Sequence, residues 1–433
     1  MSGRGGRRDA GLREPLRRGG GPRAANRSEP EVRESIVGAR LDLDVGSVAH
    51  GGHCVARAPD GRVVFVRHTL PGERVVAVVT EERSGYLRAD AVEIRRPSPD
   101  RVSAPCPYAG PDRCGGCDFQ HVTPGAQREL KATVVREQLV RLGRLTGEEV
   151  DALGVHVVPL PGGMLGWRTR LRYTVNANGR AGLLKHRSHE VVPVDACLIA
   201  APDVRAEDVT GQHWPEEDAI EVVAASGDGV SVSGITGTQS RTVAGPAKVT
   251  ETVAGRRWLL EPSVFWQVHA AAPDVFVDAV MTMLEPRTGE RAWDLYGGAG
   301  LFAAALADAV GNRGSVTLVE SDDGAVLAAS ANLADLPQVT VFSSPVERAQ
   351  PRGRPDIVVL DPPRSGAGAR VVAQLVAAAP RAIAYVACDP AALARDVATF
   401  RAAGWTLAQL RAFDAFPMTH HVECIALLTP PAE

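Results

Sequence analysis

Long apolar runs are missing from this sequence of 433 residues. The longest candidate, residues 371–388, is interrupted by Gln374, Pro380 and Arg381, so it falls short of the ~18 residues of a membrane helix. The N-terminus also lacks the apolar core of a secretory signal. We therefore expect a cytoplasmic protein without membrane contact. Its length predicts two to four domains at about 100–200 residues each.

A strong charge of one sign is missing as well, since the net charge is only −3. This near balance excludes a basic coat protein for nucleic acid, so any RNA site must be local. The balance is uneven along the chain: residues 1–33 carry a charge of +5 and the remainder carries −8. An Arg/Gly-rich tail over residues 1–34 cannot bury a core, and we expect it to be disordered. Such a tail can hold phosphates loosely, or it can simply increase solubility.

Cysteines are few and odd in number, seven in all. In a reducing cytosol this favours metal binding or catalysis over disulfides. Three of them, Cys106, Cys114 and Cys117, are clustered, and Cys197 follows eighty residues after Cys117. Four thiols can hold either zinc or a [4Fe-4S] cluster, and the spacing does not choose between them.

Residues 35–96 read as a small β-barrel of the OB type. Short apolar runs alternate with turns that contain Pro71-Gly72 and Ser84-Gly85. The clearest runs lie at residues 63–66, 74–79 and 91–94. Five or so short strands within sixty residues are typical of such a barrel.

Residues 97–262 predict a mixed α+β central domain. Apolar residues at helical spacing indicate a helix over residues 124–142. A strand-rich stretch follows, in which Arg168, Arg170 and Arg172 alternate and should share one strand face. That face can grip phosphates, or it can be an ordinary solvated surface.

Residues 263–433 alternate between apolar strands and Ala-rich helices. The predicted strands lie at residues 292–296, 315–319, 356–360, 382–386 and 424–428. Strands separated by helices indicate an α/β, Rossmann-like domain with a doubly wound parallel sheet.

The first strand of this domain runs into a glycine turn, Asp294-Leu295-Tyr296-Gly297-Gly298-Ala299-Gly300. Glycines allow a nucleotide to approach the backbone closely, and Glu320 ends the next strand, where an acid can hold ribose hydroxyls. NAD and S-adenosylmethionine both fit this pattern. The carboxylate of Asp294 would repel a pyrophosphate more than a sulfonium, which favours S-adenosylmethionine over a dinucleotide-dependent oxidoreductase.

Three further polar residues stand at strand ends. Asp361, ahead of two prolines, can hydrogen-bond a base edge, or it can belong to an ordinary turn. Cys388 precedes a helix whose N-terminus would stabilise a thiolate, a good nucleophile for an electron-poor ring. Glu423 opens the last strand, where it can act as a general base or remain a solvated acid.

The stretch at residues 46–57 resembles the TRAM domain, an RNA-binding barrel. Taken in order, the motifs resemble the TRAM-containing, iron–sulfur RNA 5-methyluridine (uracil-C5) methyltransferase family over residues 36–430. The resemblance implies a [4Fe-4S] cluster, with zinc as the alternative, held by Cys106, Cys114, Cys117 and Cys197. It also implies that S-adenosylmethionine is bound by Gln267, Tyr296, Glu320 and Asp361.

The same resemblance implies the chemistry. Cys388 would add to C6 of uracil, C5 would take the methyl group, and Glu423 would remove the C5 proton. The family's usual Cys-Asn-Pro reads Cys388-Asp389-Pro390 here, and seven residues rather than five separate Cys106 from Cys114. We expect a monomer that acts on ribosomal RNA, with transfer RNA as the alternative. The rivals are a non-catalytic RNA-binding protein and a radical S-adenosylmethionine enzyme, whose Cys-x3-Cys-x2-Cys motif is missing from this sequence.

Overall fold

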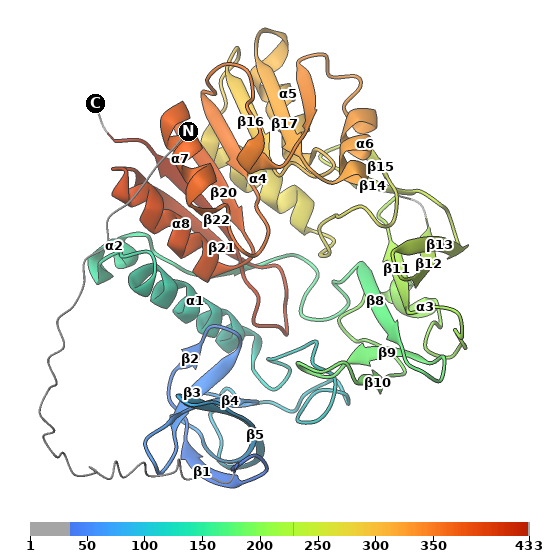
Figure 1. The fold of residues 1–433 in the computed structure, drawn as a ribbon, viewed down its shortest axis with the longest axis vertical. Helices are drawn as coiled ribbons and strands as arrows, with labels where there is room; N and C mark the ends of the chain where they lie inside the picture. The colour runs from blue at the N-terminus through green and yellow to red at the C-terminus, as the bar shows by residue number, and fades with distance from the viewer. Residues whose placement is uncertain (1–34, 228, 432–433) are drawn as a thin grey trace, which may run out of the picture. The chain divides into compact units, whose positions relative to one another are not determined.

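The computed structural model describes residues 35–227 and 229–431. The predicted Arg/Gly-rich tail, residues 1–34, lies outside this part of the chain. The described residues form three larger sheets and one two-stranded sheet (Figure 1). Among the described helices, none is both long enough and apolar enough to cross a bilayer.

The first sheet belongs to the predicted small barrel and has the strand order β1-β5-β6-β4-β3-β2. Buried and half-buried residues alternate along β3 and β4, as expected for strands with one face on a core. The strands are β1 (Arg40–Asp44), β2 (Val48–Ala49), β3 (His53–Arg57), β4 (Val63–Arg67), β5 (Arg74–Glu82) and β6 (Tyr86–Arg96). The turn between β2 and β3 contains Gly51 and Gly52, both with positive φ.

The second sheet is antiparallel, with the order β10-β9-β8-β11-β12-β13, and the hairpin β14–β15 follows it. Its strands are β8 (Arg170–Val175), β9 (Ala181–Leu184), β10 (Val191–Pro193), β11 (Ala219–Ala224), β12 (Val230–Thr236) and β13 (Gln239–Ala244). The hairpin is β14 (Val249–Val253) and β15 (Arg256–Leu260), and the short helix α3 spans Pro202–Ala206.

The predicted arginine face of this sheet is only partly correct. Arg172 is exposed, but Arg170 is 7% exposed and donates to the carbonyl oxygens of Pro262 and Val264. Its guanidinium also lies 3.7 Å from the carboxylate of Glu251. Because its guanidinium is buried among these groups, Arg170 is not free to grip a phosphate.

The third sheet has eight strands in the order β18-β17-β16-β19-β20-β22-β21-β7. They are β7 (Val157–Pro159), β16 (Arg291–Leu295), β17 (Ser315–Glu320), β18 (Val339–Ser343), β19 (Ile357–Leu360), β20 (Ala382–Ala387), β21 (Thr406–Asp414) and β22 (Glu423–Thr429). Helices cover both faces, as the run of fully buried residues in β19 requires. The Rossmann-like prediction is therefore confirmed.

One face of this sheet packs on α4 (Ala272–Leu284), α5 (Leu301–Val310) and α6 (Asp323–Asn332). The other packs on α1 (Pro124–Arg141), α7 (Gly368–Ala378) and α8 (Pro390–Ala402) (Figure 1). The helix predicted over residues 124–142 is thus confirmed as α1. The remaining short helices are α2 (Gly147–Ala152), η1 (Gly311–Arg313) and η2 (Val346–Arg348).

The sheet differs from the sequence-based expectation in two ways. First, β22 runs antiparallel to β20, so the sheet is mixed and not wholly parallel. Second, β7 pairs with β21 although it comes from the segment assigned to the central domain. The helix α1, from the same segment, packs against α8 and β7. Strand β7 therefore extends the Rossmann-like sheet, and α1 packs beside it.

Candidate active site

The glycine turn lies where the strand order of the large sheet reverses, between β16 and its neighbours β17 and β19. Ligands bind at the carboxyl ends of the strands at such a switch point. Asp294 fixes the turn by accepting a hydrogen bond from the Ala303 amide at 2.8 Å. Gly300 has a φ of +95°, and a Cβ on it would lie 2.6 Å from a methyl carbon of Leu333. A side chain at this position would therefore be strained and would collide with Leu333.

The acids of the predicted cofactor site gather around this turn. Glu320 accepts hydrogen bonds from the amides of Gly298 at 3.0 Å and Asp322 at 2.8 Å. The Asp361 amide donates to the Leu295 carbonyl at 3.2 Å, which ties β19 to the same turn. Burial, together with the charge of Glu320, raises the pKa of Asp361 to about 7.

Asp294 and Tyr296 occupy the turn itself. Asp294 is fully buried, and burial raises its pKa to about 7 despite the Ala303 hydrogen bond. With a pKa near neutrality, Asp294 would repel a pyrophosphate less than a fully charged carboxylate would. The electrostatic preference for S-adenosylmethionine over a dinucleotide is therefore weaker than the sequence predicted. Tyr296 has a φ of +60°, and burial raises its pKa to about 12. Gln267 is half-buried in the loop between β15 and α4.

Cys388 and Glu423 are neighbours because β20 and β22 are antiparallel. Ala387 is paired with Cys424 in the ladder, so the next residues, Cys388 and Glu423, stand side by side where β20 ends and β22 begins. Glu423 is 3% exposed, and Cys388 is half-buried. The predicted nucleophile and the predicted base thus share one end of the sheet with Asp361.

The electrostatics at Cys388 differ from the expectation. Burial and the nearby carboxylates of Glu423 and Asp361 raise the pKa of Cys388 to about 12, although Arg364 acts in the opposite direction. Burial and these carboxylates therefore oppose the thiolate that the N-terminus of α8 was expected to favour. Burial, and then the charge of Asp361, also raises the pKa of Glu423 well above its usual value.

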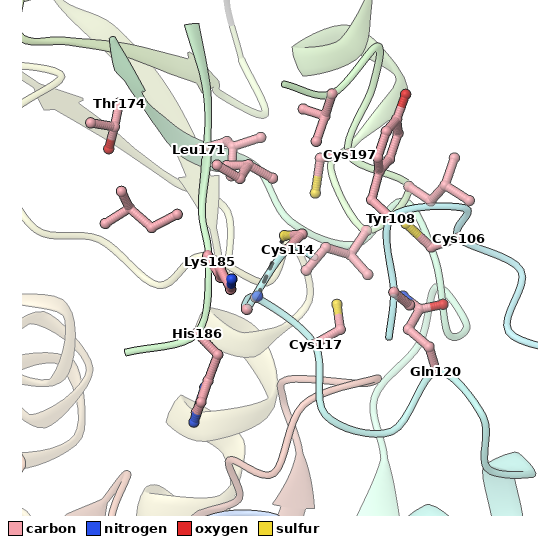
Figure 2. Close-up of a pocket in the computed structure, with 18 of the residues that line it drawn as sticks. Cys106, Tyr108, Cys114, Cys117, Gln120, Leu171, Thr174, Lys185, His186 and Cys197 are labelled. Atoms are coloured by element: carbon pink, nitrogen blue, oxygen red, sulfur yellow. Dashed lines mark hydrogen bonds between the residues drawn. The ribbon is translucent and has the colours of Figure 1, made fainter. Parts of the chain in front are cut away.

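The four clustered cysteines line one cavity of about 780 Å³ (Figure 2). Burial raises the pKa of Cys117 to about 12 and also raises the pKa values of Cys114 and Cys197. A set of thiols suits zinc or a [4Fe-4S] cluster. However, in residues 35–227 and 229–431 no group of three or more His, Cys, Asp or Glu side chains is arranged as a metal site. The predicted ligands are brought to one cavity, but not into a closed site.

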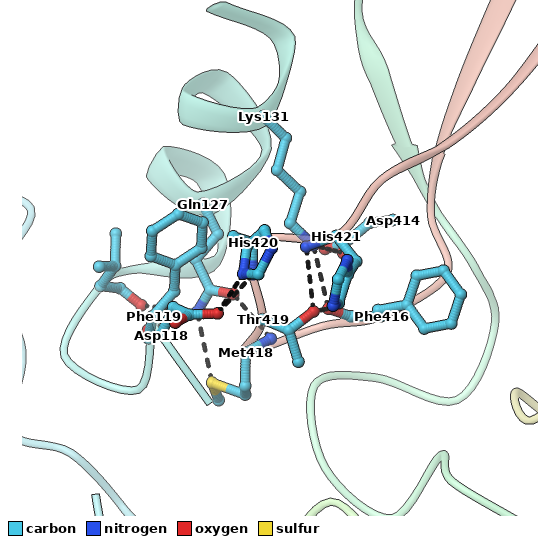
Figure 3. Close-up of polar contacts among 11 residues, drawn as sticks. Asp118, Phe119, Gln127, Lys131, Asp414, Phe416, Met418, Thr419, His420 and His421 are labelled. Atoms are coloured by element: carbon cyan, nitrogen blue, oxygen red, sulfur yellow. Dashed lines mark hydrogen bonds and ion pairs between the residues drawn. The ribbon is translucent and has the colours of Figure 1, made fainter. Parts of the chain in front are cut away.

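Sequence reasoning missed the residues that hold the loop ahead of Glu423. Lys131 of α1 is buried, contacts the Asp414 carboxylate and donates to the Phe416 carbonyl at 3.0 Å (Figure 3). On the same loop, His420 donates through its amide to Asp118 at 3.0 Å, and its ring pairs with Asp118 at 2.6 Å. A lysine within the apolar face of the helix predicted over 124–142 is the sequence signal that could have revealed this anchor.

Comparison with protein families agrees with this arrangement. Residues 34–92 match the TRAM domain, residues 261–385 match the methyltransferase small domain, and residues 354–430 match the tRNA (uracil-5-)-methyltransferase family. A solved structure of the tRNA (uracil-54, C5)-methyltransferase of Pyrococcus abyssi, in complex with S-adenosyl-L-homocysteine, superposes with a TM-score of 0.66. It is 21% identical and covers 89% of this chain and 99% of its own, a likeness in fold.

Full-length relatives are closer in sequence. An uncharacterized RNA methyltransferase of Streptomyces avermitilis is 49% identical over 92% of this chain and 100% of its own length. The 23S rRNA (uracil(1939)-C(5))-methyltransferase of Halomonas elongata is 32% identical over 97% of this chain and 96% of its own. The chain therefore belongs to the S-adenosylmethionine-dependent RNA (uracil-5-)-methyltransferase family.

Proposed function

We propose that this enzyme forms 5-methyluridine in ribosomal RNA, with Cys388 as the nucleophile and Glu423 as the general base. The Cys388 thiol first loses its proton to solvent. The resulting thiolate bonds to C6 of the uracil, and the C5–C6 double-bond electrons move toward O4, which makes C5 nucleophilic. S-adenosylmethionine supplies the methyl group for the new bond at C5 and leaves as the neutral thioether. The uracil must leave its stack to reach these residues.

The second half of the reaction restores the ring. The Glu423 carboxylate takes the proton from C5, and the electrons of that C–H bond re-form the C5–C6 double bond. The bond between C6 and the Cys388 sulfur breaks at the same time, which returns the thiolate. The balance is one methyl group transferred and one proton released to solvent.

The placement of Cys388 beside Glu423 at the end of the antiparallel pair β20–β22 carries this proposal. The nucleophile acts at C6 and the general base acts at C5, which are neighbouring carbons of one uracil ring. The two side chains must therefore reach the same uracil together. Asp361 lies at the same sheet end and is proposed, with Gln267, Tyr296 and Glu320, to bind S-adenosylmethionine. The positive φ of Gly300 shapes the glycine turn that would hold this ligand.

Ribosomal RNA is proposed as the substrate on the strength of the Halomonas relative, whose name specifies 23S rRNA. The barrel offers a surface that suits single-stranded RNA. Phe65 makes edge contacts with His53 at 4.8 Å and with Tyr86 at 5.5 Å between ring centroids. The Arg88 guanidinium lies 5.7 Å from the Phe65 ring and 5.4 Å from the Tyr86 ring. Half-buried rings beside a cation are the groups on which unpaired bases stack.

We further propose that Cys106, Cys114, Cys117 and Cys197 bind a [4Fe-4S] cluster, with zinc as the alternative metal. The supporting observation is that four thiols from two distant segments line one cavity. No proposed catalytic step is an oxidation or a reduction, so this cluster would be structural.

A covalent trapping experiment tests the proposed chemistry. RNA that carries 5-fluorouridine at the target position cannot lose a proton from C5, so the enzyme should remain bonded to it. We expect a denaturant-resistant RNA adduct with the wild type and S-adenosylmethionine, and none with Cys388→Ala. Transcripts of 23S rRNA and of transfer RNA, compared in parallel, identify the substrate class. A Cys388→Ala enzyme that still forms 5-methyluridine would refute the proposal.

A further inference from the structure

The turn between β2 and β3 of the barrel contacts the loops of both proposed catalytic residues. His50, the first residue of this turn, places its Nε2 atom 3.0 Å from a carboxylate oxygen of Asp389. Asp389 directly follows Cys388 in the chain. This contact joins residues 339 positions apart in the sequence, one in the barrel turn and one at the N-cap of α8.

Asp389 is held from two sides. Its Oδ1 atom accepts a hydrogen bond from the Ala392 amide at 2.7 Å and so caps the N-terminus of α8. Its Oδ2 atom faces His50. Because one oxygen is committed to the helix and the other to the barrel, the backbone at Cys388 is fixed relative to both.

The same turn meets the loop ahead of Glu423. Gly52 is buried, with a φ of +77°, and a Cβ on it would lie 2.6 Å from the His420 Cβ and 3.0 Å from the Asp118 Cβ. His420 is itself held by Asp118 (Figure 3). Only a residue without a side chain allows the turn to approach this closely.

We propose that the β2–β3 turn of the barrel aligns the nucleophile loop with the base loop, and that His50 is a positioning residue acting through Asp389. The inference rests on the proposed function, in which Cys388 and Glu423 act on one uracil. A barrel that binds RNA and also holds both loops in place would position the substrate and the two catalytic residues at the same time. A displacement of about 1 Å at a reacting group can reduce a rate about a hundredfold.

The test compares His50→Ala, His50→Gln and Asp389→Asn with the wild type. The readouts are the single-turnover rate of adduct formation on 5-fluorouridine RNA, the affinity for that RNA and the KM for S-adenosylmethionine. We expect His50→Ala to lower the rate about ten- to hundredfold while both binding constants change less than about twofold. Glutamine keeps a donor for Asp389, so His50→Gln should recover most of the rate. His156→Ala, an exposed histidine bonded to its own loop at Gly154, is the matched control.

A double-mutant cycle separates alignment from simple loss of stability. If His50 acts through Asp389, the rate of His50→Ala/Asp389→Asn should be close to that of the slower single variant. A His50→Ala rate within about twofold of the wild type would overturn the positioning role, and so would a loss confined to RNA affinity. A wild type that forms no adduct would overturn the proposed function itself, which distinguishes the two failures.

Discussion

Replacement of Lys131 by methionine should strongly destabilise the Rossmann-like sheet. Lys131 and Asp414 are each 1% exposed, and burial lowers the pKa of Lys131 against the opposing charge of Asp414. The Oδ2 atom of Asp414 has no hydrogen-bond partner in the described part of the chain. The variant would therefore leave a buried carboxylate without a cation, which costs about 3–5 kcal/mol of unfolding free energy.

This cost corresponds to a fall in Tm of roughly 6–20 °C for a domain of about 150–250 residues. Thermal unfolding followed by circular dichroism measures it. Lys248→Met, at an exposed lysine, is the control and should leave Tm nearly unchanged. Lys131→Met/Asp414→Asn removes both charges and should recover part of the loss. A fall of less than about 2 °C in Lys131→Met, or a double variant no more stable than the single, would refute the reasoning.

Three further predictions concern the site. Glu423→Gln removes the base for the C5 proton, so it should slow release of the product about 10²- to 10⁴-fold. A covalent complex with RNA that carries ordinary uridine should accumulate and be visible by denaturing electrophoresis. Rapid turnover would exclude Glu423 as the base. The pKa of Cys388 is raised to about 12, so the thiolate fraction, and with it the rate of 5-fluorouridine adduct formation, should rise about tenfold per pH unit from pH 7 to 9. Arg364→Ala should lower this rate at each pH. A flat profile would contradict the assignment of Cys388 as the nucleophile. Cys197→Ser should reduce the iron and acid-labile sulfide bound per chain, and unchanged metal content would remove Cys197 from the ligand set.

Local sequence patterns were enough to predict most strands of the Rossmann-like sheet and the residue types of its candidate site. Runs of apolar residues predicted β16, β17, β19 and β20 closely, because buried parallel strands must be apolar along their whole length. The glycine turn and the acid at Glu320 were readable because both are local signals in which a few consecutive residues set the backbone. The family resemblance rested on the same short motifs.

How distant residues meet depends on the folded chain and is not visible in local sequence patterns. The antiparallel direction of β22 places Glu423 beside Cys388, and no local pattern reports strand direction. The addition of β7 to the sheet, the Lys131–Asp414 anchor and the His50–Asp389 contact likewise join residues far apart in the chain. The pKa of Cys388 also depends on tertiary structure. Burial and two carboxylates raise it, and both depend on packing that the sequence does not display.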